Sequence, residues 1–200
     1  MPVEIELKLR VDSHEPVRDR LEHLDATRIG VAVETNQILD RPDGALRGQG
    51  CGLRVRIAQD QGTGEPGTGE PETGELTTTL TFKGPRTSGV IKSREEIETV
   101  VADSAELVKI LGRLGFVSIL EYQKRRESWT LDGCRIELDT PAILGKFVEI
   151  EGDSEDSIRA VQQKLHLGDA FEEGRSYVAM LISYCEQVAA ADRVFHIKPK

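Results

Sequence analysis

The chain has 200 residues, of which 38% are hydrophobic and 30% are charged, so it is long enough for one domain with a packed core. Its net charge of −9 argues against general nucleic-acid binding, which needs a basic face, but allows an anion in a local cationic cluster. Long apolar runs and a signal-peptide pattern are absent, and three cysteines are widely spaced. We therefore expect a cytoplasmic protein with reduced thiols and no membrane partner.

The first half of the chain alternates charged and aliphatic residues in short segments, a period typical of strands. One helix is expected at residues 14–26, where apolar residues recur with helical spacing. Pro42-Asp43-Gly44 predicts a turn. The expected strands are residues 3–10, 28–40, 45–58, 76–84 and 90–101.

An insert at residues 60–75 separates two of these strands. Within it, residues 62–75 read GTGEPGTGEPETGE, with the pentapeptide GTGEP occurring twice. A segment without apolar residues cannot bury enough surface to offset the entropy lost on ordering. We interpret it as a disordered loop, more typical of a tolerated surface insertion than of a mobile lid.

The second half predicts three more strands, at 117–131, 133–140 and 146–151, and three helices, at 105–115, 154–166 and 175–190. In the first of these helices, Leu107, Ile110, Leu111 and Leu114 form the expected buried stripe. About eight strands joined mostly by hairpins, with about four helices, indicate an α+β domain over residues 1–190, followed by a tail at 191–200. Eight antiparallel strands can form a barrel wide enough for one small ligand.

Charges spaced two residues apart recur on most of the expected strands. One such strand indicates a solvated surface, but many, with both signs, suggest a shared polar interior that is wet, metal-bound or filled by a charged ligand, because desolvation costs several kcal/mol per ion. The alternative is an open sheet face covered by cross-strand ion pairs. The acids are Glu4, Glu6, Glu96, Glu98, Glu137, Asp139, Glu149 and Glu151, and the bases are Lys8, Arg54, Arg56, Lys83, Arg94, Lys124 and Arg126.

This set carries eight acids and seven bases, so carboxylates alone would repel an anion. Two divalent cations would change the sign of the interior and bring it close to neutralising a triphosphate. Hard oxygen ligands favour Mg²⁺ or Mn²⁺. Arginine and lysine would then hold the phosphate oxygens.

With these residues assigned, the chain resembles the CYTH family, the triphosphate tunnel metalloenzymes, over residues 3 to about 185. The family includes class IV adenylyl cyclases, thiamine-triphosphatases and inorganic tripolyphosphatases. Each motif is short, but the six follow one another in the family's order. The matching segments are Glu4-Ile5-Glu6-Leu7-Lys8, Leu53-Arg54-Val55-Arg56, Lys83-Gly84-Pro85, Lys124-Arg125-Arg126, the pairs Glu137 with Asp139 and Glu149 with Glu151, and Arg175-Ser176-Tyr177.

The resemblance implies an eight-stranded antiparallel closed β-barrel, the triphosphate tunnel, with flanking helices. It implies metal ligands for Mg²⁺ or Mn²⁺ at Glu4, Glu6, Glu149 and Glu151, assisted by Glu137 and Asp139. The expected catalytic residues are Lys8, Arg54, Arg56 and Arg126. The expected phosphate-binding residues are Lys8, Arg54, Arg56, Lys83, Arg94, Lys124, Arg126 and, at one tunnel end, Arg175.

Three functions follow from this resemblance. The first is a metal-dependent hydrolase of inorganic tripolyphosphate, thiamine triphosphate or a nucleoside triphosphate such as ATP. The second is a class IV adenylyl cyclase, which would make cyclic AMP and pyrophosphate from ATP. A cyclase would need an adenine-binding site, and no residue of the sequence clearly indicates one. The third is a non-catalytic triphosphate-binding module. The physiological substrate and the oligomeric state are left open by the sequence.

Overall fold

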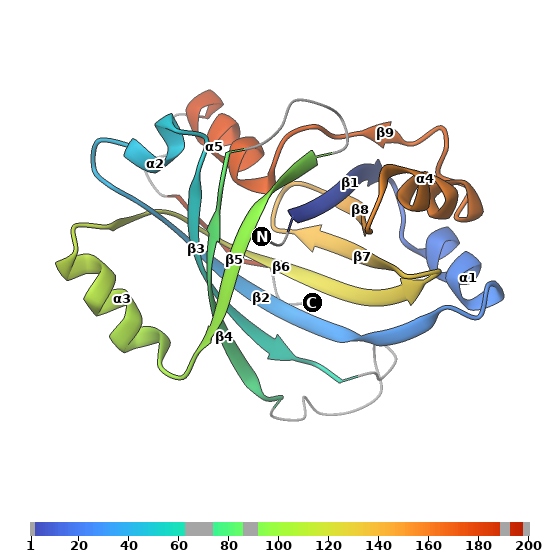
Figure 1. Ribbon diagram of the computed structural model, residues 1–200, viewed down its shortest axis with the longest axis horizontal. Helices are drawn as coiled ribbons and strands as arrows, with labels where there is room; N and C mark the ends of the chain where they lie inside the picture. Colours follow the sequence, from blue (N-terminus) through green and yellow to red (C-terminus); the bar gives the residue numbers. More distant parts are fainter. Residues whose placement is uncertain (1–2, 63–73, 86–91, 189–192, 198–200) are drawn as a thin grey trace.

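One ten-stranded sheet with five helices around it makes up the computed structural model, which describes residues 3–62, 74–85, 92–188 and 193–197. Figure 1 shows the helices lying along the margins of the sheet. The strands are β1 (Val3–Val11), β2 (Thr27–Asp40), β3 (Gly52–Asp60), β4 (Leu76–Lys83), β5 (Lys92–Val101), β6 (Val117–Leu131), β7 (Cys134–Pro141), β8 (Lys146–Glu151), β9 (Phe171–Glu172) and β10 (Val194–Phe195). The helices are α1 (Glu15–His23), α2 (Ala45–Gly48), α3 (Ser104–Arg113), α4 (Glu155–Lys164) and α5 (Tyr177–Gln187).

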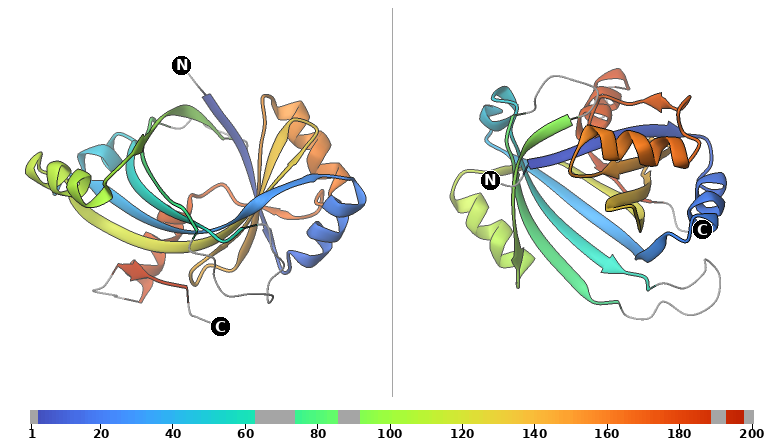
Figure 2. Two further views of the ribbon diagram at one scale, coloured as in Figure 1. Left: turned by 90° about the horizontal axis from the view of Figure 1, so that it is seen from below. Right: turned by 45° about the vertical axis from the view of Figure 1, so that its right-hand side comes forward.

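The eight long strands pair in the order β6-β2-β3-β4-β5-β1-β8-β7, each antiparallel to the next, and β7 also pairs with β6. The sheet therefore curves, and Figure 2 shows its concave side. The expected antiparallel α+β fold with flanking helices is confirmed. The closed eight-stranded β-barrel that would form a triphosphate tunnel is not confirmed and stays a prediction.

The period-two pattern of β1 positions the site. Leu7 and Leu9 are fully buried in a core that also holds Ile136 and Ile158, the latter from α4. Because successive side chains point to opposite faces of a strand, Glu6 and Lys8 point to the other side. That side is the concave one, where both residues line a cavity.

A second apolar cluster joins α5 to the concave side of the sheet. Tyr177 and Leu181 of α5 pack with Tyr122 of β6 and Phe147 of β8. The Phe147 and Tyr177 rings meet edge to face at 5.2 Å between centroids. Helix α5 therefore forms one wall of the concave space.

The predicted strand at 45–58 is wrong at its start, where residues Ala45–Gly48 form the helical turn α2. Asp40, which is 2% exposed, accepts hydrogen bonds from the backbone N–H groups of Leu46 (2.9 Å) and Arg47 (3.2 Å). Gly44 begins the turn with φ of 72°, a left-handed conformation that glycine adopts without strain. The remaining part of the prediction corresponds to β3.

The predicted apolar stripe of α3 is only partly buried. Leu111 is buried and Leu107 packs beside it, whereas Ile110 and Leu114 are 56% and 60% exposed. Helix α3 lies at one end of the sheet (Figure 1). The helix covers only a small apolar cluster around Leu53, so the side chains of one helical turn are enough to bury it.

Two strands of two residues each escaped prediction because such short segments carry no readable period. β9 pairs with β1, and β10 runs parallel to β6. Cys51, Cys134 and Cys185 are free thiols, as expected. None of the described helices has the length and apolarity needed to cross a membrane. The repeats of the insert lie at residues 63–73, outside the described residues.

Candidate functional site

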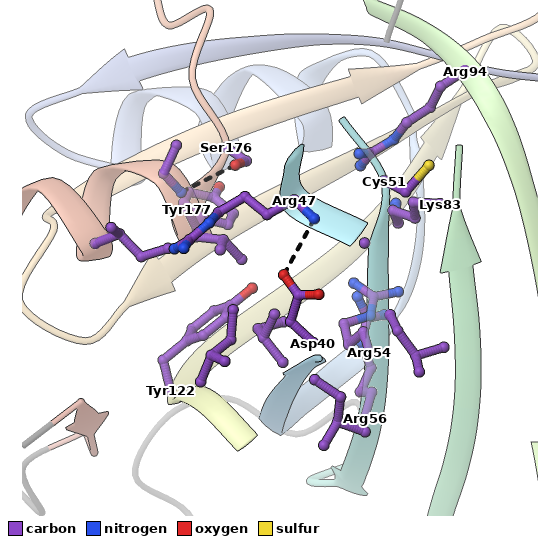
Figure 3. A pocket seen from close by; sticks show the side chains of 18 of the residues that line it. Asp40, Arg47, Cys51, Arg54, Arg56, Lys83, Arg94, Tyr122, Ser176 and Tyr177 are labelled. Carbon is purple, nitrogen blue, oxygen red and sulfur yellow. Dashed lines mark hydrogen bonds between the residues drawn. The ribbon is translucent and has the colours of Figure 1, made fainter. Parts of the chain in front are cut away.

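A cavity of about 320 Å³ lies among the long strands, α2 and α5. Figure 3 shows Arg54, Arg56, Lys83 and Arg94 on one side of it, across from Tyr122. Cationic groups outnumber carboxylates among its lining side chains, so the cavity suits an anion. The cationic lining residues are Lys8, Arg47, Arg54, Arg56, Lys83, Arg94, Lys124 and Arg126, and the acidic ones are Glu6, Asp40 and Glu149.

Strand β3 supplies two arginines that alternate with buried valine and leucine residues. Arg54 Nη2 donates to Thr81 Oγ1 at 3.2 Å. Arg56 Nε donates to Asn36 Oδ1 at 3.1 Å, and Arg56 Nη1 lies 3.3 Å from Glu34 Oε1. Burial, together with the charge of Arg56, lowers the pKa of Arg54 below its ordinary value, which indicates too little negative charge around this guanidinium.

Two buried donor atoms at this wall have no acceptor among the described residues. Arg54 Nε and Asn36 Nδ2 are buried and make no hydrogen bond to any described residue. Buried polar atoms nearly always have partners, and Arg54 belongs to the cavity lining, so an acceptor bound in the cavity would satisfy its Nε. A phosphate oxygen has the chemistry to meet this need.

Arg126 of β6 lies between two carboxylates. Its Nε and Nη2 donate to Asp139 at 2.7 and 2.5 Å, and Nη2 also donates to Glu149 Oε2 at 2.6 Å. Burial favours the neutral guanidine, but Asp139 and Glu34 outweigh it and raise the pKa of Arg126 well above its usual value. Arg126 therefore stays charged and fixed in orientation.

Two lysines complete the interior. Lys8 Nζ lies 3.0 Å from Glu149 Oε1 and 4.0 Å from the centre of the Tyr177 ring. Lys124 Nζ lies 3.0 Å from Asp139 Oδ2 and 3.4 Å from Glu34 Oε2. Burial opposes the charge of each lysine, yet Glu149 raises the pKa of Lys8, whereas burial and Arg126 lower that of Lys124.

Lys83 and Arg94 also line the cavity, and Lys83 Nζ lies 2.6 Å from Glu96 Oε2. Arg175 is placed differently. Its guanidinium is paired with the buried Glu173 at 2.8 Å, and it is not among the described lining residues. This pairing lowers the pKa of Glu173 to about 2. Seven of the eight predicted phosphate-binding residues are thus brought together.

The carboxylates predicted to bind metal divide into two groups. Glu6 and Glu149 line the cavity, and in the β1–β8 register Glu6 is opposite Glu151 while Lys8 is opposite Glu149. Glu4 lies on β1 opposite Arg94, with its side chain outside the described part of the structure.

Asp139 and Glu137 lie behind the cations. Asp139 is fully buried among Arg126, Lys124 and Tyr177, and Glu137 accepts a 2.5 Å hydrogen bond from Ser128 Oγ. Among the described residues, no three His, Cys, Asp or Glu side chains converge into a group that could hold a metal ion. Asp139 contacts Arg126 and Lys124, and Glu137 Oε2 lies 3.8 Å from Arg126 Nε. The part of these two carboxylates in metal binding stays a prediction.

Four residues of the site were given no role from the sequence, although Tyr177 lies in one of the matching motifs. Glu34 and Asn36 are buried, and they lie two apart on β2, the same spacing that identified the other strands. Tyr177 Oη donates to Asp139 Oδ2 at 3.0 Å, and burial and Asp139 raise the pKa of Tyr177 well above its usual value. Arg47 reaches the cavity from α2, a turn that strand reasoning did not anticipate.

Comparisons with known proteins agree with this arrangement. The CYTH domain family model matches residues 2–177. "Putative adenylate cyclase MJ0240" of Methanocaldococcus jannaschii is 26% identical over 149 residues, 74% of this chain and 76% of that protein. The structure of PH1819 protein from Pyrococcus horikoshii OT3 has a TM-score of 0.74 at 26% identity and covers 90% of this chain and 99% of its own.

A more distant structure shares the fold alone. "Putative adenylyl cyclase HpAC1" from Hippeastrum, described as revealing a dominant triphosphatase activity, has a TM-score of 0.65 at 18% identity, covering 90% of this chain and 96% of its own. The family model spans most of the chain and includes every described strand of the cavity wall. The chain therefore belongs to the CYTH domain family.

Proposed function

We propose that the protein is a divalent-metal-dependent triphosphatase that binds a triphosphate in the cavity among the long strands and hydrolyses its terminal phosphoric anhydride. The observation that carries this proposal is the excess of cationic over acidic side chains lining the cavity, together with the buried Nε of Arg54, which has no hydrogen-bond partner among the described residues. Phosphoryl transfer depends almost entirely on positioning and on neutralising charge, which such a lining supplies.

The wall formed by β3, β4 and β5 would bind the phosphate chain. Arg54 and Arg56 present planar guanidinium groups suited to two phosphate oxygens at once, with Lys83 and Arg94 beside them. On the opposite side, Asp139 keeps Arg126 in place and Glu149 keeps Lys8 in place, so both cations stay charged. Fixed cations of this kind stabilise the leaving phosphate as its charge grows.

Carboxylate oxygens on β1 and β8, of the kind that Mg²⁺ and Mn²⁺ prefer, would form the metal site. Glu6 and Glu149 offer carboxylate oxygens to the cavity, and Glu4 and Glu151 lie on the same two paired strands. A divalent ion bound there would neutralise charge on the transferring phosphoryl group and the leaving phosphate. The circuit of strand pairings further suggests that the eight strands act as a closed tunnel around the substrate.

Adenylyl cyclase activity is the second candidate, because the relative from Methanocaldococcus jannaschii bears that name. A cyclase would align the ribose 3′-hydroxyl with the α-phosphate of ATP and release pyrophosphate. A hydrolase would align water with the terminal phosphate and release orthophosphate. The product formed from ATP separates the two, since both use the same cationic wall.

The test is phosphate release from tripolyphosphate, thiamine triphosphate and ATP with Mg²⁺ or Mn²⁺, with and without EDTA. We expect orthophosphate as the main product and loss of turnover with EDTA. Arg54→Gln should lower the rate by about 100-fold, whereas Arg113→Gln, an exposed change on α3, should not. Cyclic AMP as the main product would support the cyclase, and tight binding without turnover would support a binding module.

A further inference from the structure

A second charged cluster lies on the face of β6 opposite the cavity. Because Arg126 lines the cavity, its neighbours Arg125 and Glu127 point to the other face of the strand. Glu127 is fully buried there and accepts hydrogen bonds from Arg18 Nε of α1 at 2.9 Å and from Trp129 Nε1 at 3.2 Å. Figure 1 shows α1 beside the end of β6. A buried carboxylate outside the cavity therefore links β6 to α1.

Three arginines surround this one carboxylate, and we call them the outer arginines: Arg18, Arg28 and Arg125. Arg28 Nε lies 3.3 Å from Glu127 Oε1, and Arg125 Nη1 lies 3.7 Å from Glu127 Oε2. Burial opposes the ionisation of Glu127, but Arg18 and Arg28 outweigh burial and lower the pKa of this carboxyl below its ordinary value. The cluster therefore carries three positive charges against one negative charge.

Among the described residues, neither the strands paired with β6 nor α1 balances this excess. Glu15 and Glu22, each about one turn from Arg18 on α1, form no ion pair with it in the described structure. Burial and the charges of Arg18 and Arg28 lower the pKa of Arg125, although Glu127 opposes them, so this third arginine is short of negative charge. The residues directly opposite Arg125 and Glu127 on β2 and β7 are uncharged: Val33, Thr140, Val31 and Leu138.

The outer arginines keep hydrogen-bond donors for a ligand. Their side chains are between 22% and 32% exposed. Arg18 contacts Glu127 through Nε, and neither of its Nη atoms donates a hydrogen bond to a described residue. Arg125 approaches Glu127 at a distance too long for a hydrogen bond. Guanidinium groups fixed in this way can donate to two oxygens of one anion with little further loss of side-chain freedom.

We propose that the outer arginines bind a small divalent oxyanion, of the phosphate or sulfate class, on the face of β6 opposite the cavity. Two negative charges on the anion would balance the excess positive charge of the cluster. Glu127 has a positioning role, because it orients the guanidinium groups from the buried side. This site is separate from the cavity and does not depend on hydrolysis there.

The test uses selenate, a divalent oxyanion whose selenium is located in crystals by anomalous scattering and whose binding is followed in solution by calorimetry. The variant is Arg125→Gln, which leaves the hydrogen bonds from Arg18 and Trp129 to Glu127 in place. The control, Arg113→Gln, removes the same charge from an exposed position on α3. Melting temperatures check that the variants are folded, and Arg125→Lys is a second variant that keeps the charge but loses the planar fork.

We expect selenate between Arg18 and Arg125 in crystals of the unaltered protein and of the control, whether or not the cavity also holds selenate. In calorimetry, Arg125→Gln should lose one binding event or show that event with an affinity about tenfold weaker. If Arg125→Gln does not fold, Arg125→Lys decides, since it should bind selenate more weakly than the unaltered protein.

Selenate in the cavity alone, or a variant that binds selenate at the cluster as tightly as the unaltered protein, would overturn the inference. A selenium signal at the outer arginines without a corresponding event in calorimetry would mark an adventitious ion only and would overturn it as well.

Discussion

Arg126 and Asp139 face each other on paired strands and are joined by two hydrogen bonds, at 2.7 Å from Nε and 2.5 Å from Nη2. Asp139 is fully buried and also binds Lys124 and Tyr177. One carboxylate thus holds two cations and a phenol in place. This relationship makes Asp139 a positioning residue for the cavity.

Asp139→Asn should therefore destabilise the protein strongly, because two buried cations lose their shared counter-charge. We expect the free energy of unfolding to fall by about 3 kcal/mol in urea titrations. Asp132→Asn is the control, since the Asp132–Lys164 pair is about half exposed and should contribute less than about 1 kcal/mol. Similar losses in both variants would contradict the positioning role.

The stability of the protein at acid pH should depend on the ionisation of Glu34. Burial opposes its ionisation, but Lys124 and Arg56 outweigh burial and lower the pKa of Glu34 well below its ordinary value. Because the pKa is lower in the folded state than in the unfolded state, the ionised Glu34 carboxylate stabilises the fold above pH 4.5. This stabilisation is lost progressively as the pH falls below 4.5. Glu34→Gln should lower stability at pH 7 and flatten its decline between pH 5 and pH 3.

Urea titrations at several pH values measure this slope. The exposed Glu22→Gln on α1 is the matched control and should retain the slope of the unaltered protein. A slope in Glu34→Gln as steep as that of the control would show that the decline comes from other groups.

Tyr177→Phe removes one hydroxyl while keeping the ring beneath Lys8. The variant leaves Asp139 with one hydrogen bond fewer, so we expect a loss of about 1.5 to 3 kcal/mol, the usual range for a hydrogen bond to a charged group. Tyr184→Phe is the same change on the same helix at a side chain that is 40% exposed. Thermal denaturation should show a fall in melting temperature for the first variant and little change for the second.

Shortening the insert should leave activity within about twofold, because the entropy of loop closure changes little with loop length. Changes at the two ends of the insert should affect stability more than changes within it. Gly62 O accepts from Val31 N at 3.2 Å, and a Cβ on Gly74 would lie 1.7 Å from the Asp60 carbonyl oxygen. Removal of 64–72 should therefore be tolerated, and Gly74→Ala should be destabilising. Phosphate release and melting temperature measure the two effects.

Much of the site was readable from the sequence because strand side chains alternate. The period of β1 placed Leu7 in the core and Lys8 in the cavity, and β3 placed Arg54 and Arg56 together in the same way. The motifs of the family then set these strands beside one another. The same rule would have found Glu34 on β2, which matches no motif and was overlooked.

What the sequence could not give depends on contacts between distant residues. Arg175 matches a family motif, but Glu173, two residues earlier, pairs with its guanidinium. Asp139 has the spacing of a metal ligand, and that spacing does not reveal its contacts with Arg126 across β6 and with Tyr177 on α5. The exposed Ile110 follows from the small area that α3 covers at the end of the sheet, which helical periodicity does not encode.

The most direct measurement of the central claim is a crystal structure with imidotriphosphate and Mn²⁺, read through the anomalous signal of manganese. We expect the phosphate chain to contact Arg54, Arg56 and Arg126, with an oxygen accepting from Arg54 Nε, and manganese beside Glu6 or Glu149. A triphosphate bound on the outer face of the sheet, with the cavity among the strands occupied only by water, would contradict the account.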